Sequence, residues 1–280
     1  MKKLLYLLLA CVLCSALVFT ACSKDSQEQI DEATETTETT EAEVTQEQIE
    51  KNIVGTWIKS EVDGQSALTN EKSVYDIVST TEAYASASRV IDEVTPFDYN
   101  HKSVVDLNGN VVTITTTNAD GESLVHEFTI TSISDSELTA NQKFTCKPKG
   151  TDPIIIEDTV SFVKVNADYS EDILGTWEGR CTSEGSIFDD GQDHRWEYKD
   201  DGTFVYYVKN GDDWVPSEDT MNEYFVAGNL LSSRWMENGQ ENREWWEISI
   251  DGDKMNWTAL REDEDGKTFT ATFEMTKVEE

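Results

Sequence analysis

Basic residues are scarce in this sequence. Of its 280 residues, 22 are Lys or Arg and 56 are Asp or Glu, which gives a formal net charge of −34. Such a surface repels phosphate backbones and anionic membrane surfaces, so nucleic acid is not expected as a partner. We interpret the acidity as a source of solubility in a salty exterior.

Cysteine is also scarce, with five in the whole chain. Cys11 and Cys14 lie in an apolar N-terminal run, Cys22 follows that run, and only Cys146 and Cys181 lie further along. A framework of paired cysteines is missing, so the sequence does not indicate disulfide-stapled domains. We expect two separately buried thiols, with a disulfide between them as the alternative.

The chemistry-bearing residues form no catalytic pattern. The three histidines, His101, His126 and His194, have unrelated surroundings, and no Ser or Cys motif of nucleophilic type accompanies them. His126 lies on an apolar strand face and is interpreted as a packing residue. The acidic run 189–193 lacks the full calcium-loop pattern. We therefore expect no enzymatic activity, no cofactor and no metal site.

The N-terminus has the pattern of a signal peptide. Lys2 and Lys3 precede an apolar run over residues 4–19, which small residues close before Cys22. The apolar run is shorter than a typical transmembrane helix, and acidic sequence follows it. A transmembrane anchor is the alternative interpretation. Residues 1–21 are thus predicted to be a cleaved lipoprotein signal peptide.

The junction Phe19-Thr20-Ala21-Cys22 resembles the lipobox of bacterial lipoproteins. That resemblance implies cleavage before Cys22 and attachment of lipid, including palmitate-type acyl chains, to its sulfur, which would hold the protein at a membrane. The adjoining run 23–25 (Ser-Lys-Asp) resembles the export signal of lipoproteins in the Bacteroides group. It implies a cell-envelope protein in the outer membrane, exposed at the cell surface.

Residues 22–50 are acidic and rich in Thr, with no aromatic residue. A segment of this composition cannot bury a core, so it is predicted to be a disordered, self-repelling tether.

The rest of the chain contains an internal repeat. Residues 53–57 (Ile-Val-Gly-Thr-Trp) recur as 173–177 (Ile-Leu-Gly-Thr-Trp), and 126–130 align with 246–250 at the same spacing. The repeat predicts two domains, residues 51–166 and residues 170–280 in a chain expected to be monomeric.

Each repeat is predicted to be all-β. Apolar and polar residues alternate in runs such as 269–275, and Asn-Gly or Asp-Gly turn signals separate the runs. Short strands at this spacing, with little helical periodicity, predict an antiparallel meander that forms either a barrel or a sandwich.

Gly-Thr-Trp at the head of the first strand, followed by a meander of about eight strands, resembles the lipocalins, and most closely bacterial lipocalin-like lipoprotein domains. The resemblance implies two tandem antiparallel β-barrels, each with a Trp at its closed end and a basic side chain of the last strand across the ring. The corresponding residues are Gly55, Trp57 and Lys164 in the first copy, and Gly175, Trp177 and Lys277 in the second. The usual basic residue of the family is Arg, its Thr-Asp-Tyr motif is missing here, and no helix precedes the last strand.

Tryptophan is concentrated in the second repeat, which holds all but one of the eight. Such rings suit a small apolar ligand or a sugar face, and they also fill solid cores. Trp245 and Trp246 point to opposite strand faces and cannot both line one cavity. The candidate ligand-binding residues are Trp196, Tyr206, Trp235, Trp246 and Trp257.

We therefore predict a non-catalytic envelope lipoprotein that binds a small apolar or amphipathic ligand in a barrel. The alternative is a surface module with solid barrels, which would bind a glycan or a protein through exposed aromatic residues.

Overall fold

A computed structural model describes residues 44–87, 102–117, 122–147, 150–183, 190–263 and 265–279. Apart from the short helices α1 (Gln46–Asn52) and η1 (Thr69–Glu71), the regular structure consists of strands arranged in two nine-stranded sheets. Both sheets lie within one compact unit of the chain. The lipobox, Cys22 and His101 lie outside the described residues. Among the described residues, no helix has the length and apolar character needed to cross a membrane.

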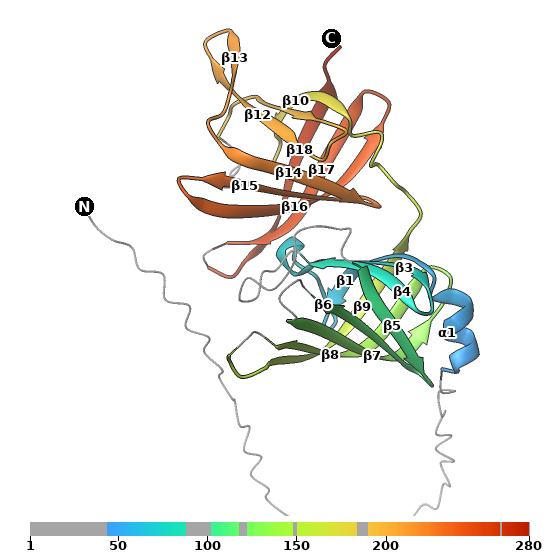
Figure 1. Cartoon of the computed structure of the whole chain (residues 1–280). Coiled ribbons are helices and arrows are strands. Elements are labelled where there is room, and N and C mark those ends of the chain that lie inside the picture. Colours follow the sequence, from blue (N-terminus) through green and yellow to red (C-terminus); the bar gives the residue numbers. More distant parts are fainter. Residues whose placement is uncertain are drawn as a thin grey trace, which may run out of the picture. The chain divides into compact units, whose positions relative to one another are not determined.

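The first sheet closes into a barrel (Figure 1). Its strands are β1 (Gly55–Val62), β2 (Gln65–Ser66), β3 (Ser73–Ser79), β4 (Glu82–Ala87), β5 (Lys102–Asn108), β6 (Val111–Thr117), β7 (Ser123–Ile133), β8 (Glu137–Lys147) and β9 (Ile154–Val165). All pairings are antiparallel between neighbours along the sheet, and β1 pairs with both β3 and β9. Trp57 therefore lies between Tyr75 on one side and Lys164 on the other. The short strand β2 pairs only with the end of β1.

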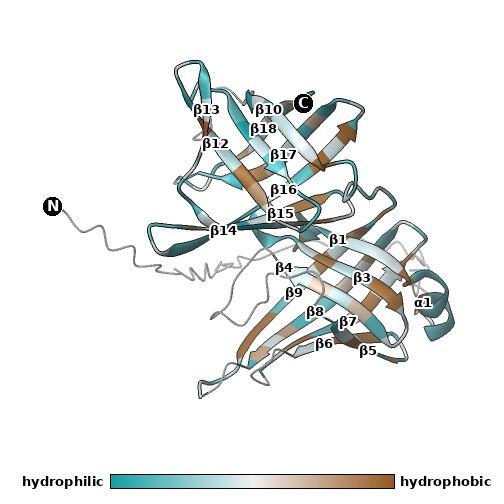
Figure 2. Cartoon of the chain, turned by 45° about the horizontal axis from the view of Figure 1, so that its top comes forward, coloured by the Kyte–Doolittle hydropathy of each residue, from teal (hydrophilic) through white to brown (hydrophobic). Residues whose placement is uncertain are grey.

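Strand alternation produces the core of this barrel. In β7 every second side chain from Leu124 to Ile130 is buried, and hydrophobic and hydrophilic residues alternate along the strands in Figure 2. A side chain on one face of a strand points into the barrel and its neighbour points outward. The inward residues form one cluster that includes Trp57, Tyr75 and Phe128.

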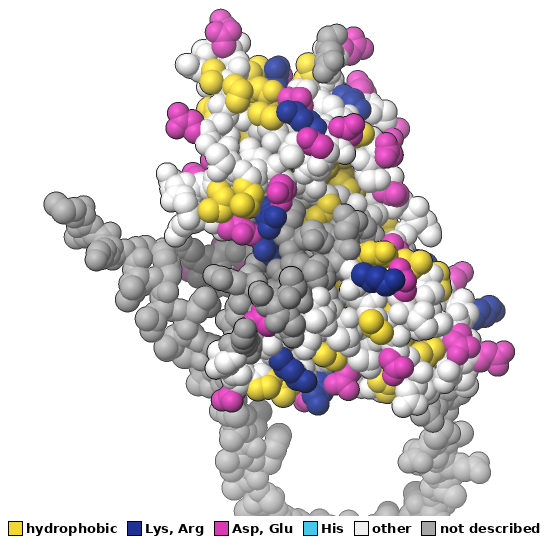
Figure 3. Space-filling view, viewed as in Figure 1, with side chains coloured by type: hydrophobic (Ala, Val, Ile, Leu, Met, Phe, Trp, Pro, Cys, Tyr) yellow, Lys and Arg dark blue, Asp and Glu magenta, His cyan; other side chains and the backbone are white. Residues whose placement is uncertain are grey.

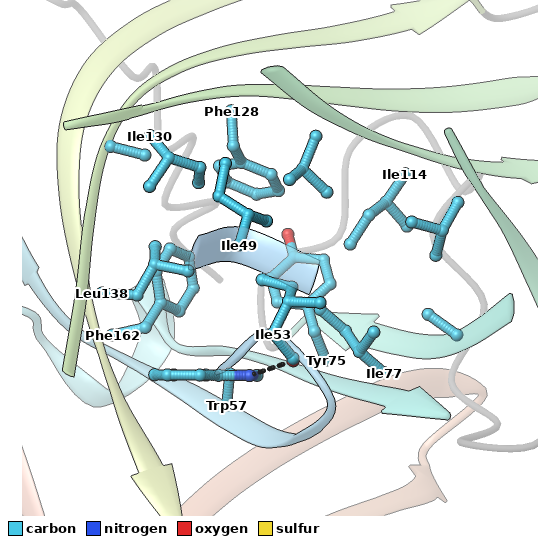
Figure 4. Close-up of a cluster of buried hydrophobic side chains, with 14 of the residues drawn as sticks. Ile49, Ile53, Trp57, Tyr75, Ile77, Ile114, Phe128, Ile130, Leu138 and Phe162 are labelled. Atoms are coloured by element: carbon cyan, nitrogen blue, oxygen red, sulfur yellow. Dashed lines mark hydrogen bonds between the residues drawn. The ribbon is translucent and has the colours of Figure 1, made fainter. Parts of the chain in front are cut away.

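The helix α1 corrects the predicted extent of the disordered tether, which was expected to reach residue 50. Thr45 caps the helix by accepting from the backbone of Gln48, whose side chain accepts from Thr45 in turn. Ile49 is 0% exposed and packs with Ile53 inside the core cluster (Figure 4). The prediction was wrong from residue 44 onward. It rested on the average composition of the segment and did not use the spacing of Ile49 and Ile53, which lie four residues apart on one helix face.

The second sheet repeats the meander but curls without full closure. Its strands are β10 (Gly175–Cys181), β11 (His194–Tyr198), β12 (Phe204–Asn210), β13 (Asp213–Pro216), β14 (Thr220–Ala227), β15 (Leu230–Glu237), β16 (Gln240–Asp251), β17 (Lys254–Glu262) and β18 (Thr268–Lys277). The sheet runs in the order β13-β12-β11-β10-β18-β17-β16-β15-β14, so β13 and β14 are its edges. The prediction of tandem all-β barrels is confirmed, with an open seam in the second copy.

The seam lies between β12 and β14. One isolated bridge joins Thr203 to Glu223, and the backbone N–H of Tyr224 donates to the carbonyl of Gly202 at 2.8 Å. In β14 the pairing shifts register between Thr220 and Glu223. The two strands are thus joined at one end of the seam and diverge toward the other.

A further buried cluster contains residues of both copies. Its members are Ile58, Val74, Ala227, Leu230 and Trp245. At the same contact Lys72 Nζ lies 2.7 Å from Glu247 Oε1. Trp245 packs in this cluster, whereas Trp246 belongs to the core of the second copy, so the two rings do take opposite faces of β16.

Candidate ligand-binding cavity and the duplicated barrel floor

One end of each barrel, called the floor below, has the same structure in both copies. It is formed by Gly55, Trp57 and Lys164 in the first copy and by Gly175, Trp177 and Lys277 in the second. Trp57 and Trp177 are 2% and 0% exposed. The indole Nε1 of Trp57 donates to the carbonyl of Ile53, and that of Trp177 donates to the carbonyl of Ile173, both at 2.7 Å. Each indole is therefore satisfied by the turn that leads into its own strand.

A lysine from the last strand lies over each of these rings. Lys164 Nζ is 4.9 Å from the Trp57 ring centroid, and Lys277 Nζ is 5.1 Å from that of Trp177, both within cation–π range. Lys164 also donates to the carbonyls of Asn52 and Val54, at 2.8 and 2.7 Å. Burial lowers the pKa of Lys164 from its usual value.

The glycine of each Gly-Thr-Trp motif leaves room for this lysine. A Cβ on Gly55 would lie 2.9 Å from Lys164 Cε, and one on Gly175 would lie 3.1 Å from Lys277 Cε. Both glycines have positive φ, +135° and +108°, which other residues rarely adopt. The three barrel-floor residues of each copy therefore form one packed unit.

The interior of the first barrel is mostly filled. A cavity of about 20 Å³ lies beside Trp57, and one of about 110 Å³ lies beside His126, Gln142 and Lys59. Tyr75 Oη and Gln142 Nε2 each lie 3.0 Å from His126 Nδ1, and both can donate to it. Burial, with a smaller contribution from Lys59, lowers the pKa of His126 to about 3. His126 is thus a neutral, hydrogen-bonded core residue.

The second copy contains a partly open cavity of about 370 Å³. All five residues predicted to bind a ligand line this cavity. The described residues that line it are Asp190, His194, Trp196, Tyr198, Phe204, Tyr206, Asp219, Ser233, Trp235, Glu237, Glu244, Trp246, Trp257 and Phe273. The aromatic rings of the second copy thus both pack in its core cluster and line this cavity.

Aromatic rings in mutual contact form the wall of this cavity. The Trp257 ring centroid lies 4.7 Å from that of Trp196, 5.6 Å from that of Trp246 and 5.7 Å from that of Phe273. Trp196 in turn lies 5.3 Å from Tyr206. The rings that line the cavity thus also pack against one another.

Polar groups lie beside these rings. His194 Nδ1 lies 2.9 Å from Tyr206 Oη, and His194 Nε2 lies 3.2 Å from Asp190 Oδ1. The pKa of Tyr206 is raised by burial and then by the charges of Asp190 and Asp219. Two carboxylates therefore act electrostatically on the same hydroxyl group.

One carboxylate faces the barrel interior. Burial raises the pKa of Glu244, an effect that the charge of Arg261 and a hydrogen bond from Trp246 oppose. Arg261 Nη2 lies 3.4 Å from Glu244 Oε1, and its guanidinium lies 4.9 Å from the Trp246 ring centroid.

Sequence reasoning missed the polar part of the lining. Glu244 lies two residues before Trp246 on β16, so strand parity already indicated that it faces inward. Glu237 is the last residue of β15 and lies two residues after Trp235, so parity indicated that it shares the face of that ring. Asp219 lies just before β14, where parity gives no guidance. Among the described residues, no three His, Cys, Asp or Glu side chains are placed to hold a metal ion. Cys146 and Cys181 are both buried, and no disulfide joins them.

No protein-family model and no curated protein sequence matches the chain. A protein of unknown function of the DUF3598 family from Nostoc punctiforme is 10% identical with a TM-score of 0.24, and the alignment covers 85% of this chain and 100% of that one. Transferrin binding protein B from Haemophilus parasuis is 9% identical with a TM-score of 0.22, covering 78% of this chain. A second structure of transferrin binding protein B, with its N and C lobes, is 9% identical with a TM-score of 0.21, covering 76% of this chain. The chain spans 62% of the length of each transferrin binding protein. At these TM-scores, none of the three bears on the function of the chain.

Proposed function

We propose that this chain is a non-catalytic binding protein of the bacterial cell envelope, held at the membrane by lipid on Cys22. The cavity of the second barrel is its binding site, and the ligand is a small amphipathic molecule. The observation that carries the proposal is the cavity itself, about 370 Å³ in volume and walled by eight aromatic side chains.

The size and lining of the cavity favour such a ligand. Its volume falls at the lower end of the range for small-molecule sites, which combine apolar walls with a few polar groups. An eight-stranded barrel has room for one small ligand when its side chains do not fill it. The polar groups beside Tyr206 would orient the polar end of the ligand, while the rings cover its apolar part.

The two copies differ in the role that we assign to them. The first barrel has a closed sheet and a plug formed by Ile49 on α1, so we assign it a structural role. The second has a seam between β12 and β14, and both Phe204 and Tyr206 of β12 line the cavity. Separation of the two strands at this seam would open a lateral route to the cavity with little loss of backbone pairing.

Native mass spectrometry of the full chain, purified from its own cells, tests the proposal. We expect a retained small molecule in the wild type and its loss in Trp246→Ala, because this ring forms part of the wall. Trp214→Ala is the matched control, since Trp214 on β13 is absent from the cavity lining and packs against Arg195 and Lys209. Equal retention in both variants would place the ligand elsewhere.

A second candidate function rests on the β12–β13 hairpin. Val208 and Val215 form a cross-strand pair on this hairpin and are 48% and 45% exposed. An exposed apolar pair favours a surface module that binds a glycan or a protein. In that case a glycan array would detect binding that Val208→Thr with Val215→Thr removes and Trp246→Ala leaves intact.

A further inference from the structure

We propose that the ligand of the second barrel is an organic cation, with an ammonium or guanidinium group held between the aromatic wall and the carboxylates of the cavity. This inference rests on the proposed function and specifies the chemical class of its ligand.

The charges around the cavity are unbalanced. Four carboxylates line it, and no lysine or arginine does among the described residues. Asp190 contacts His194, and Glu244 contacts Arg261. In the described part of the chain, neither Asp219 nor Glu237 has a cationic group within 4.0 Å. Two negative charges therefore border an aromatic cavity with no countercharge from the protein.

The second copy already holds cations in the same way elsewhere. The guanidinium of Arg261 lies 4.9 Å from the Trp246 ring centroid and contacts Glu244. Arg195 of β11 and Lys209 of β12 likewise lie 4.7 and 5.3 Å from the ring centroid of Trp214 on β13. A cation over an indole beside a carboxylate is thus an arrangement that these strands form with their own side chains, and a ligand cation in the cavity would meet the same groups.

A buried hydrogen-bond donor sets a second requirement for the ligand. Trp257 is 3% exposed and lines the cavity, and its Nε1 has no hydrogen-bond partner among the described residues. Buried indole N–H groups normally find an acceptor. A ligand with a hydroxyl or carbonyl oxygen beside its cationic group would supply one.

The net charge of the whole protein also favours a cationic ligand. Its formal net charge is −34, and on the face shown in Figure 3 acidic side chains are spread over the described surface while basic ones form a few small groups. Such a field attracts cations and repels fatty acids, phosphates and other anions. A neutral apolar molecule would gain nothing from Asp219 or Glu237.

The test compares three probes of similar shape. Benzyltrimethylammonium is the cation, neopentylbenzene is its neutral carbon isostere, and phenylmethanesulfonate is an anion. Binding to the full chain is followed by tryptophan fluorescence and native mass spectrometry, up to about 1 mM probe. We expect the cation to bind about tenfold more tightly than the isostere and the anion to show no binding.

Charge variants distinguish the site from the general field of the protein. Asp219→Asn with Glu237→Gln should weaken binding of the cation about tenfold and leave the isostere unchanged. Asp251→Asn with Asp253→Asn is the matched control, because it removes the same charge from the β16–β17 turn near the floor, and it should change neither affinity.

The remaining outcomes overturn one proposal or both. If the isostere binds as tightly as the cation and Trp246→Ala abolishes both, the cavity is a binding site without charge preference, and this inference fails while the proposed function stands. If none of the three probes binds, both the charge preference and the binding cavity are wrong.

Discussion

Removal of the Lys277 side chain tests whether the lysine stabilises the floor of the second barrel. In Lys277→Ala the contact with the Trp177 ring at 5.1 Å is lost, together with a long hydrogen bond of 3.4 Å to the carbonyl of Asp172. A partly exposed cation–π contact contributes about 0.5–1 kcal/mol, and the stem adds packing over Gly175. We expect the free energy of unfolding to fall by about 1–2 kcal/mol.

The first barrel supplies a matched comparison. Lys164 makes the same ring contact but donates two short hydrogen bonds, to the carbonyls of Asn52 and Val54. A hydrogen bond from a charged group contributes about 1.5 kcal/mol or more, against which the cost of burying the ammonium must be set. Lys164→Ala should therefore destabilise its barrel by about 1–2 kcal/mol more than Lys277→Ala destabilises the other.

Hydrogen exchange followed by mass spectrometry measures both effects in the full chain, because peptides from β1 and β9 report on one barrel and peptides from β10 and β18 on the other. Lys277→Arg is the conservative control and should lie within about 0.5 kcal/mol of the wild type. If Lys277→Ala also lies within that limit, as an ordinary surface substitution does, the lysine is not part of the floor. Equal costs in the two barrels would refute the reasoning from the hydrogen bonds.

Three further predictions concern other parts of the chain. Cys22→Ser should release the protein from the membrane fraction and abolish labelling by fatty-acid analogues; a variant that stays bound and labelled would place the anchor elsewhere. Ile49→Ala should lower the free energy of unfolding of the first barrel by about 2–4 kcal/mol in urea titration, whereas no change would return this residue to the disordered tether. The folded-state pKa of His126 is about 3, below its usual 6.5, so the unfolded state binds more protons between these values and stability falls as the pH drops through that window. His126→Gln keeps an acceptor for Tyr75 and Gln142 but removes the titrating group. Between pH 6.5 and 4 the stability of this variant should fall less steeply than that of the wild type, by up to about 1.4 kcal/mol per pH unit. Equal slopes in the two proteins would mean that His126 does not titrate in this way.

Much of the fold could be predicted from the sequence because its main signals are local. The period of two in each strand and the turn residues between strands define a meander, and the repeated Gly-Thr-Trp gives the start of each copy. Strand parity also placed Trp245 and Trp246 on opposite faces of their strand, as the structure has them.

What could not be predicted depends on distant parts of the chain. The width of a barrel decides whether its aromatic rings fill the interior or surround a cavity. In the second copy this width depends on the seam between β12 and β14, and no local sequence pattern encodes it. Asp219 reaches the cavity from just before β14, outside the strand pattern. The helix α1 is a different case, because Thr45 and Gln48 form a capping pair that the sequence displays and that the acidic composition around it obscured.

The floor of the first barrel has a mechanical consequence. Thr56 near the start of β1 pairs with Val165 at the end of β9, so the chain enters and leaves this barrel at neighbouring positions. Tension along the chain would peel these two strands apart one pair at a time instead of shearing the whole ladder at once. Lys164 bridges the last strand to the carbonyls of Asn52 and Val54, just before β1 begins. Lys164 therefore joins the two strands at the point where peeling would start, so it should raise the force needed to open the first barrel from its chain ends.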